Sequence, residues 1–315
     1  MERLRSWQLL AVCVLTWGTT WYAITFQIGH TSPEVSVALR FALAGGLVLT
    51  MCALRGLPLR FSAREHVRLA LQGGFMYGVS YLCVYHAERH IVSALVAVGY
   101  SASPLVAGLG ARLLFGARFT PQFGFGGVLG LAGVALIFWP EFGKAAGSDG
   151  RSAALGAVFT VASVLLSSIG SLTASRNRAH GLPFWPALGL GMLYGAGVAA
   201  LFALAQGQSF MPPAAISWWL SLLYLALAGS VLTFACFLTL QERIGPGPTG
   251  TVGVMTPLLA LGVSILFERF EPNLLTLSGA ALAVLGNVLM LSRPIAAKSH
   301  ADGRAFDKHR RRLRP

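Results

Sequence analysis

The chain has 315 residues, of which 55% are hydrophobic and only 11% are charged, whereas ordinary soluble domains carry about 25% charged residues. This composition excludes a single water-soluble core and predicts a protein that uses lipid as its solvent. The net charge of +13 does not indicate a nucleic-acid-binding protein, because the cations lie in short segments between apolar runs and in the C-terminal tail.

Ten apolar segments follow one another along the chain, each long enough, or nearly so, for the roughly 20 residues that cross a bilayer. Their approximate bounds are Trp7–Phe26, Pro33–Leu54, Leu69–Tyr85, Val92–Leu114, Phe123–Trp139, Ala153–Ala174, Trp185–Ala205, Ile216–Leu240, Pro248–Phe267 and Leu274–Leu291. Arg3 and Arg5 precede the first segment as in a signal peptide, but the apolar run is longer than usual and no small-residue cleavage site follows. We therefore predict that this segment is retained as the first span.

Lys and Arg are distributed unequally between the two sides that these spans define. With the N-terminus in the cytoplasm, 18 cations fall on the cytoplasmic side and four on the other, and the ratio is still ten to four without the tail. This bias predicts that both termini are cytoplasmic. We expect a multi-pass protein of the cell membrane, which in bacteria is the inner membrane.

The two halves of the chain are related by a constant offset of 153 residues. Eight pairs are identical at this offset: Pro104/Pro257, Leu105/Leu258, Ala107/Ala260, Leu113/Leu266, Gly126/Gly279, Leu129/Leu282, Gly133/Gly286 and Leu136/Leu289. Because each half contributes five spans, an odd number, the second half would enter the membrane in the opposite orientation. The prediction is an all-α polytopic membrane protein with ten transmembrane helices as two inverted five-helix repeats.

These repeats divide the chain into four parts. Residues 1–140 form the first five-helix repeat, 141–152 a linker loop rich in Gly and Ser, and 153–292 the second repeat. Residues 293–315 form a basic cytoplasmic tail that we expect to be disordered and to touch anionic lipid. Glycines in the fifth and seventh spans let helices approach closely. Internal packing is the commoner use of such glycines, and a homodimer contact is the alternative.

Aromatic residues are the first candidates for a binding site. Trp17 lies ten residues inside the first span, too deep for an interfacial belt, so its indole should face the interior. Trp21 shares its helix face and Tyr22 lies beside it, while Tyr77 and Tyr81 form a second stripe in the third span. Together these side chains could line an apolar, aromatic pocket; ordinary packing is the alternative.

Two prolines are the second set of candidates. Pro104 and Pro257 lie at equivalent positions, each about 15 Å deep in its span. A proline removes a backbone hydrogen bond, and broken helices at matching positions of inverted halves indicate a transport site. The flanking residues Tyr100, Ser101 and Met255 are therefore predicted to contact a substrate. A simple packing kink is the alternative.

Charged residues are the third set. Arg40 lies about seven residues into the second span, where a charge is costly. We expect it to snorkel outward and pair with Glu34 or Glu88; the alternative is that it holds a substrate carboxylate. His86, Glu88 and His90 form an HxExH cluster, which differs from the HExxH zinc motif. We expect a hydrated loop face there, with a proton-sensing gate as the alternative.

Several functions are not expected. All acidic residues lie near span ends or in loops, so no deep ion-coupling carboxylate is expected. The four cysteines are isolated and no metal-ligand spacing occurs. The sequence contains neither a phosphate-binding P-loop nor a nucleophile–base pair, so we expect no cofactor, no metal and no enzyme activity.

Short motifs in both halves carry a family resemblance. They are the run 17–24 (Trp-Gly-Thr-Thr-Trp-Tyr-Ala-Ile), Pro33 followed by Arg40-Phe41, and, in the second half, Pro257, Phe267-Glu268, Gly279 and Gly286. With these motifs the chain resembles the drug/metabolite transporter superfamily, in particular its EamA-domain exporters, over nearly its whole length. The resemblance implies a ten-span inverted repeat that moves small metabolites, often outward. It also implies that Glu268 stands where members of the family carry a glutamate in the second half. The first half departs from it, because 115–118 reads Phe-Gly-Ala-Arg with no acid.

The expected function is therefore an integral membrane transporter. We expect it to export a small metabolite, an amino acid or related compound, from the cytoplasm by alternating access. Its partners would be this small-molecule substrate and the lipid bilayer, with no nucleic acid. A passive pore or facilitator and a multidrug efflux protein are the alternatives.

Overall fold

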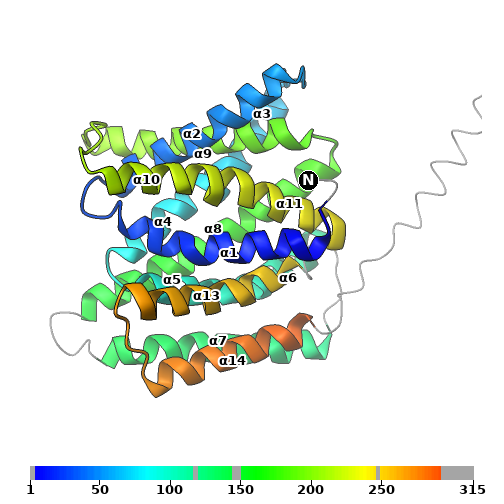
Figure 1. Ribbon diagram of the computed structural model, residues 1–315. Helices are drawn as coiled ribbons and strands as arrows, with labels where there is room; N and C mark the ends of the chain where they lie inside the picture. The colour runs from blue at the N-terminus through cyan, green and yellow to red at the C-terminus, as the bar shows by residue number, and fades with distance from the viewer. Residues whose placement is uncertain (1–3, 116–119, 144–149, 246–248, 292–315) are drawn as a thin grey trace, which may run out of the picture.

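The computed structural model describes residues 4–115, 120–143, 150–245 and 249–291, and these residues form a bundle of helices that lie side by side (Figure 1). In these ranges the β-structure is limited to an isolated bridge between Ile28 and Thr31. The Phe-Gly-Ala-Arg departure beyond Phe115, residues 144–149 of the linker and the basic tail lie outside the described residues.

The helices of the first half are α1 (Ser6–Thr25), α2 (Pro33–Leu54), α3 (Ala63–Gly73), η1 (Gly74–Val79), α4 (Ser80–Glu88), α5 (Ser93–Gly99), η2 (Tyr100–Ala102), α6 (Ser103–Phe115) and α7 (Pro121–Gly143). Those of the second half are α8 (Gly150–Ala179), α9 (Phe184–Ala205), α10 (Ile216–Tyr224), η4 (Leu225–Leu232), α11 (Thr233–Ile244), α13 (Thr251–Phe267) and α14 (Leu274–Leu291). Elements that follow one another without a gap, such as α3, η1 and α4, form one continuous rod.

Among the described residues, every segment predicted to be apolar and helical forms helix over most of its length. Within the described residues, five helices are long and apolar enough to cross a membrane: Pro33–Leu54, Ser93–Gly110, Arg151–Ala179, Phe184–Ala205 and Ile216–Ile244. Shorter apolar helices are Pro121–Ile137, Thr251–Phe267 and Leu274–Met290. The chain is therefore an α-helical, multi-pass membrane protein. The linker predicted at 141–152 overlaps the ends of two helices, because α7 continues to Gly143 and α8 begins at Gly150.

Glycines allow α7 and α14 to pack in close contact along their lengths (Figure 1). A Cβ atom on Gly133 would lie 2.5 Å from the carbonyl oxygen of Gly279, and one on Gly279 would lie 2.6 Å from that of Gly133. Gly126 and Gly286 face each other in the same way. No side chain fits at such a distance, so only glycine allows the two helices to approach this closely. In lipid, helices have no hydrophobic drive to associate and depend on such close packing. The four glycines that match between the halves thus form one seam, in which Gly126 contacts Gly286, the counterpart of Gly133, and Gly133 contacts Gly279, the counterpart of Gly126.

Two wide π-helical turns, η1 and η4, interrupt the rods of α3–α4 and α10–α11. The offset that carries Pro104 onto Pro257 also carries Gly74–Val79 onto 227–232, inside η4. Hydroxyl groups satisfy carbonyl groups of the wide turn: Ser230 Oγ donates to the Leu225 carbonyl at 2.8 Å, and Thr233 Oγ1 donates to that of Ala228 at 2.7 Å. Such turns are frequent at functional sites.

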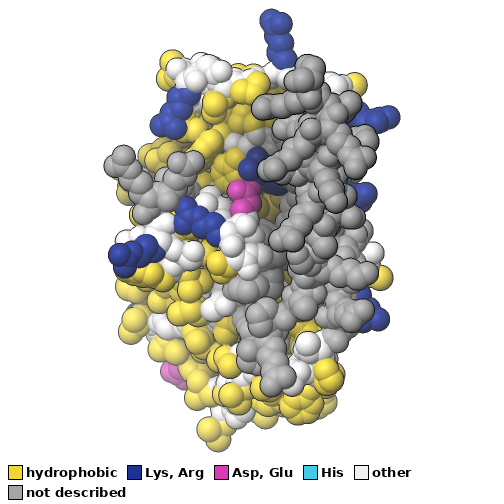
Figure 2. Space-filling view, turned by 90° about the vertical axis from the view of Figure 1, so that its right-hand side faces the viewer, with side chains coloured by type: hydrophobic (Ala, Val, Ile, Leu, Met, Phe, Trp, Pro, Cys, Tyr) yellow, Lys and Arg dark blue, Asp and Glu magenta, His cyan; other side chains and the backbone are white. Residues whose placement is uncertain are grey.

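Helices of the two halves pack against each other at the centre of the bundle. Helix α1 contacts α11 and α13, and α4 contacts α8. Leucines such as Leu54, Leu113, Leu201, Leu266 and Leu274 are exposed on the outside, as suits a surface that faces lipid. Figure 2 looks onto the end of the bundle near the N-terminus, where Lys and Arg side chains stand around the rim.

Candidate functional site

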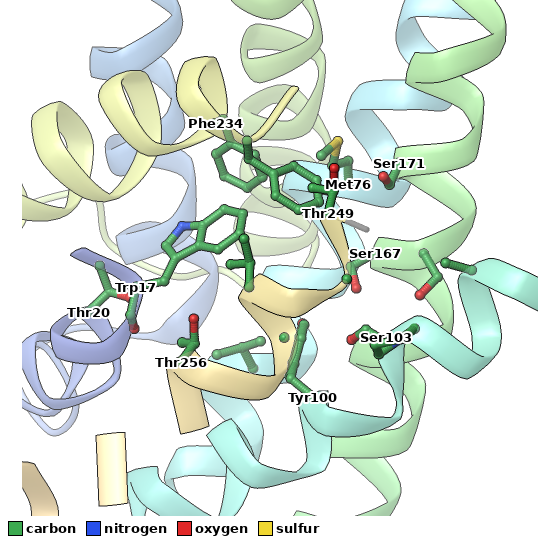
Figure 3. Close-up of a pocket in the computed structure, with 18 of the residues that line it drawn as sticks. Trp17, Thr20, Met76, Tyr100, Ser103, Ser167, Ser171, Phe234, Thr249 and Thr256 are labelled. Atoms are coloured by element: carbon green, nitrogen blue, oxygen red, sulfur yellow. The ribbon is translucent and has the colours of Figure 1, made fainter. Parts of the chain in front are cut away.

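A cavity of about 150 Å³ lies among helices of both halves (Figure 3). An engineered apolar cavity of about this size holds benzene. The first half contributes Trp17, Thr20, Trp21, Ile24, Arg40, Met76, Tyr81, Val84, Tyr100, Ser103, Pro104 and Ala107. The second half contributes Ser167, Ser168, Ser171, Leu172, Phe234, Phe237, Gln241, Thr249, Gly250, Val252, Gly253, Thr256 and Pro257. The wall is therefore mostly apolar and aromatic, with hydroxyl groups and one cation.

Trp17 forms one wall of the cavity and links α1 to the second half. Its indole N–H donates a hydrogen bond to the Gly229 carbonyl in η4 at 3.1 Å. Its ring lies 5.1 Å from the rings of Phe234 and of Phe237 on α11. Figure 3 shows Trp17 and Phe234 close together, with Ser167 and Ser171 of α8 on another side of the cavity. The prediction that this indole faces the interior is in agreement with its position.

Trp21 and Tyr100 form the opposite part of the aromatic wall, with ring centroids 5.1 Å apart. Tyr100 opens the short 3₁₀ turn η2, which separates α5 from α6 directly before Pro104. This proline therefore coincides with an irregular turn in its rod. Helix α13 instead runs through Pro257 without interruption. The two prolines both border the cavity, but the matched pair of breaks expected from the sequence is present only at Pro104.

Arg40 is fully buried and lines the cavity. Its Nε–H donates to Ser230 Oγ in η4 at 3.0 Å. The guanidinium lies 4.6 Å from the ring centroid of Tyr81 and 5.2 Å from that of Phe41, within the range of cation–π attraction. The expected outward snorkelling to Glu34 or Glu88 is not found, because Arg40 hydrogen-bonds across to the second half instead.

Four residues of the cavity wall carry buried polar atoms without a hydrogen-bond partner. They are the Trp21 indole nitrogen, both terminal nitrogens of Arg40, Ser103 Oγ and Thr256 Oγ1. Arg and Trp nitrogens can only donate. The large majority of buried side-chain polar groups in proteins are paired with protein or with ordered water, so this cluster of groups around one cavity is available to hydrogen-bond a polar ligand or water.

Four of the predicted substrate-binding residues do not line the cavity. Met255 points outward and is 43% exposed, and Tyr22 packs on Phe267 with ring centroids 5.5 Å apart. Tyr77 is buried behind the wall, 4.8 Å from Phe234. Ser101 is buried outside the lining. The other predicted aromatic residues, Trp17, Trp21, Tyr81 and Tyr100, do line it.

The HxExH cluster lies beyond the cavity, around the turn between α4 and α5. His86 Nε2 pairs with Glu34 at 2.8 Å and stacks on Phe159, and His90 stacks on the same ring and bonds to Ser152 Oγ at 2.9 Å. Both histidines are half-buried against α8, and the hydrated loop face expected here stays a prediction. Burial lowers the pKa of His90, and the neighbouring Arg89 and His86 charges lower it further.

Glu88 and Glu268 lie near each other at this same end. Glu268 accepts hydrogen bonds from Ser93 Oγ, at 2.6 Å, and from Ser264 Oγ. These bonds tie α5 to α13. Glu88 is buried, and neither of its oxygens has a hydrogen-bond partner among the described residues.

Sequence reasoning missed most of the wall that the second half supplies. Ser167, Ser168 and Ser171 of α8 and Phe234, Phe237 and Gln241 of α11 were not among the predicted residues. A signal for α8 was present, because Ser163, Ser167 and Ser171 recur every four residues and so share one helix face. Nothing comparable distinguishes the phenylalanines of α11.

Comparison with known proteins identifies the family. The model of the EamA-like transporter family matches residues 5–139 and again residues 154–292. The chain belongs to the EamA-like transporter family. This confirms the resemblance seen in the motifs, and it makes the chain a member of a family of membrane transporters.

Relatives span nearly the whole chain. The uncharacterized inner membrane transporter YedA of Escherichia coli (strain K12) is 26% identical over 292 residues, covering 90% of this chain and 92% of YedA. The uncharacterized transporter YvbV of Bacillus subtilis (strain 168) is 25% identical, covering 96% and 97%. The protein PagO of Salmonella typhimurium (strain LT2) is 23% identical, covering 81% and 82%.

A solved crystal structure shares the fold. It matches with a TM-score of 0.67 at 20% sequence identity, covering 93% of this chain and 98% of that chain. At this identity the likeness concerns the arrangement of helices alone.

Proposed function

We propose that this EamA-family member exports a small metabolite, an amino acid or a related compound, from the cytoplasm by alternating access. In this proposal its ten helical rods form two inverted five-helix repeats that rock about the central cavity. The observation that carries the proposal is the cavity itself, whose wall is shared between α1, α2, η1, α4, η2 and α6 of the first half and α8, α11 and α13 of the second.

Three features support the inverted repeat. The family model matches twice, once in each half. The π turns η1 and η4 fall at equivalent positions. The glycines of the α7–α14 seam pair crosswise, Gly126 with Gly286 and Gly133 with Gly279, which is the pattern expected when a two-fold axis exchanges the halves.

Access from the N-terminal end of the bundle is supported by where the lining residues lie. The wall includes Gln241 near the end of α11 and Thr249 and Gly250 just before α13. At the other end, the Glu34–His86 pair and the bonds of Ser93 to Glu268 hold the helices together. With the N-terminus in the cytoplasm, as the distribution of Lys and Arg favours, solute would enter from the cytoplasm.

Cysteine labelling tests alternating access. The four native cysteines, Cys13, Cys52, Cys83 and Cys236, are first replaced by alanine or serine. A single cysteine is then placed at Thr256 or Ser103, and its labelling by a membrane-impermeant thiol reagent is measured from each side. Alternating access predicts labelling from both sides, with a solute shifting the ratio; a site unreachable by water from either side contradicts the proposal.

Growth rescue identifies the solute. Cells that overexpress the chain are challenged with a panel of toxic amino acids and their derivatives, with Trp17→Ala as the matched control. Rescue that depends on Trp17 supports export through this cavity. Equal rescue by both versions would remove Trp17 from the path.

A further inference from the structure

We propose that Arg40 and Trp21 form a binding site for the carboxylate of the transported solute. The solute is then a small organic anion with an apolar or aromatic body. This inference rests on the proposed function, since it assigns the chemistry of the cavity that the proposed transport uses.

The first argument is the unused hydrogen-bonding capacity of the guanidinium. Nε of Arg40 donates to Ser230 Oγ at 3.0 Å, while both terminal nitrogens are buried and make no hydrogen bond of ordinary geometry, although the hydroxyls of Tyr81 and Tyr85 lie near the guanidinium. The two terminal nitrogens are the fork that matches the two oxygens of a carboxylate. Folding has already removed water from this fully buried guanidinium, so an anion that binds there does not have to dehydrate it.

The second argument is that the surrounding groups fix the guanidinium in place. Arg40 Cζ lies over the rings of Tyr81 and Phe41, 4.6 and 5.2 Å from their centroids. Gly229 leaves the room it needs, because a Cβ atom there would lie 3.3 Å from an Arg40 terminal nitrogen and 2.7 Å from Thr20 Cγ2. The π turn η4 thus supplies both the hydrogen-bond acceptor, Ser230, and the space. A group held this firmly loses little entropy when it binds a ligand.

The third argument is the charge of the wall. Among the described residues that line the cavity, Arg40 is a cation and none is an acid. The carboxylate of Glu88 is close enough to interact with Arg40 electrostatically, yet it makes no hydrogen bond and does not border the cavity. The Trp21 indole N–H, also unpaired, adds a second obligate donor. A solute with net negative charge is therefore favoured over a zwitterion, and a zwitterion over a cation.

Four probes that share one body test this order. They are 3-phenylpropionate (anion), phenylalanine (zwitterion), 3-phenylpropionamide (neutral) and phenethylamine (cation), and their Kd values are measured by calorimetry on the purified full chain in detergent. Charge-assisted hydrogen bonds predict that the anion binds about tenfold to a hundredfold more tightly than the amide. Arg40→Gln should abolish this ratio, and Arg40→Lys should keep part of it.

Matched variants separate a binding role from a structural one. Arg89→Gln removes an exposed cation outside the cavity and should leave the anion-to-amide ratio unchanged. Trp21→Phe keeps the ring and removes the N–H, so it should lower the ratio roughly twofold to tenfold. Because the ratio compares two ligands on the same protein, a general loss of stability does not change it, and Trp21→Phe provides the test if Arg40→Gln does not fold.

Three results would overturn the inference: a wild-type ratio near one, an unchanged ratio in Arg40→Gln or Trp21→Phe, or no binding by any probe. Counterflow of the same probes in proteoliposomes keeps the two proposals apart. Selective binding without flux contradicts transport and supports the anion site. Flux of phenylalanine and phenethylamine that is insensitive to Arg40→Gln contradicts the anion site and supports transport.

Discussion

Replacing Gly279 by alanine should loosen the seam between α7 and α14. The added Cβ atom would lie 2.6 Å from the Gly133 carbonyl oxygen and 2.6 Å from Ile137 Cγ1, whereas non-bonded carbon atoms are best placed about 3.5–4.0 Å apart. The two helices must therefore separate locally by about 1 Å. Overpacking of this kind costs about 1–3 kcal/mol. For a chain of this length, that is a fall in Tm of roughly 2–5 °C.

Thermal unfolding of the purified protein in one detergent measures the effect. Gly130→Ala is the matched control, because Gly130 lies on α7 between the seam glycines and a Cβ atom there meets nothing within 4 Å. Alanine is about 0.5–1 kcal/mol better than glycine inside a helix, so this variant should be as stable as the wild type or slightly more stable. If Gly279→Ala and Gly130→Ala unfold at the same temperature, the close contact of α7 and α14 does not exist as described.

The remaining predictions concern the cavity and the end of the bundle beyond it. Trp17→Phe removes the hydrogen bond to the Gly229 carbonyl and should reduce solute flux severalfold through a loss of about 0.5–1.5 kcal/mol, with Trp17→Ala reducing it further; flux in proteoliposomes equal to wild type in both variants contradicts this role. A double-mutant cycle of Ser93→Ala and Glu268→Gln should give a coupling energy of about 1–2 kcal/mol in thermal unfolding, because Ser93 Oγ donates a hydrogen bond to the Glu268 carboxylate. If the effects of the two substitutions are simply additive, this hydrogen bond contributes nothing to stability. Because the pKa of His90 is lowered in the folded state, from an ordinary value near 6.5, the unfolded state takes up the proton first as the pH falls. Its stabilising effect is therefore complete above about pH 6.5 and is lost as the pH falls through the folded-state pKa. Acidification should lower the Tm of the wild type more than that of His90→Gln, and parallel Tm curves for the two proteins would refute this assignment.

The helices and part of the site could be predicted because their signals are local. Apolar segments of sufficient length specify helices in lipid, and Trp17 was placed in the interior because a tryptophan at that depth needs a partner for its N–H. The break beside Pro104 was predicted because a proline removes a backbone hydrogen bond of its helix, and the same argument failed at Pro257, through which α13 runs without interruption.

The sequence did not show which side chains of a helix point into the cavity and which point outward, and α13 shows why. Met255 and Thr256 are neighbours in the sequence, but successive residues on a helix point about 100° apart. Thr256 lines the cavity and Met255 points outward. In a soluble protein the polar face of a helix is exposed, so it identifies the opposite, apolar face as the buried one. Where lipid is the solvent, both faces are apolar and this signal is lost.

Arg40 illustrates a second limit. Its depth in α2 suggested a side chain that reaches outward along its own helix, which is the local solution for a cation in lipid. The observed partner, Ser230, is 190 residues away in the sequence. It is available because the π turn η4 places its hydroxyl beside α2. A sequence read one helix at a time does not contain that distant acceptor.

The π turn η4 makes the length of its rod as important as its composition. Each backbone hydrogen bond there spans one residue more than in an α-helix, so the wide turn holds one extra residue without changing which way the following helix faces. Removal of a single residue from 225–232 would restore the regular spiral and leave Phe234, Phe237 and Gln241 bordering the hollow, but the Gly229 carbonyl that accepts from Trp17 and the Ser230 hydroxyl that accepts from Arg40 would lose their positions. Exchanges among apolar residues on the outside of this rod should be tolerated, whereas a one-residue deletion should cut the hydrogen bonds that join η4 to α1 and α2.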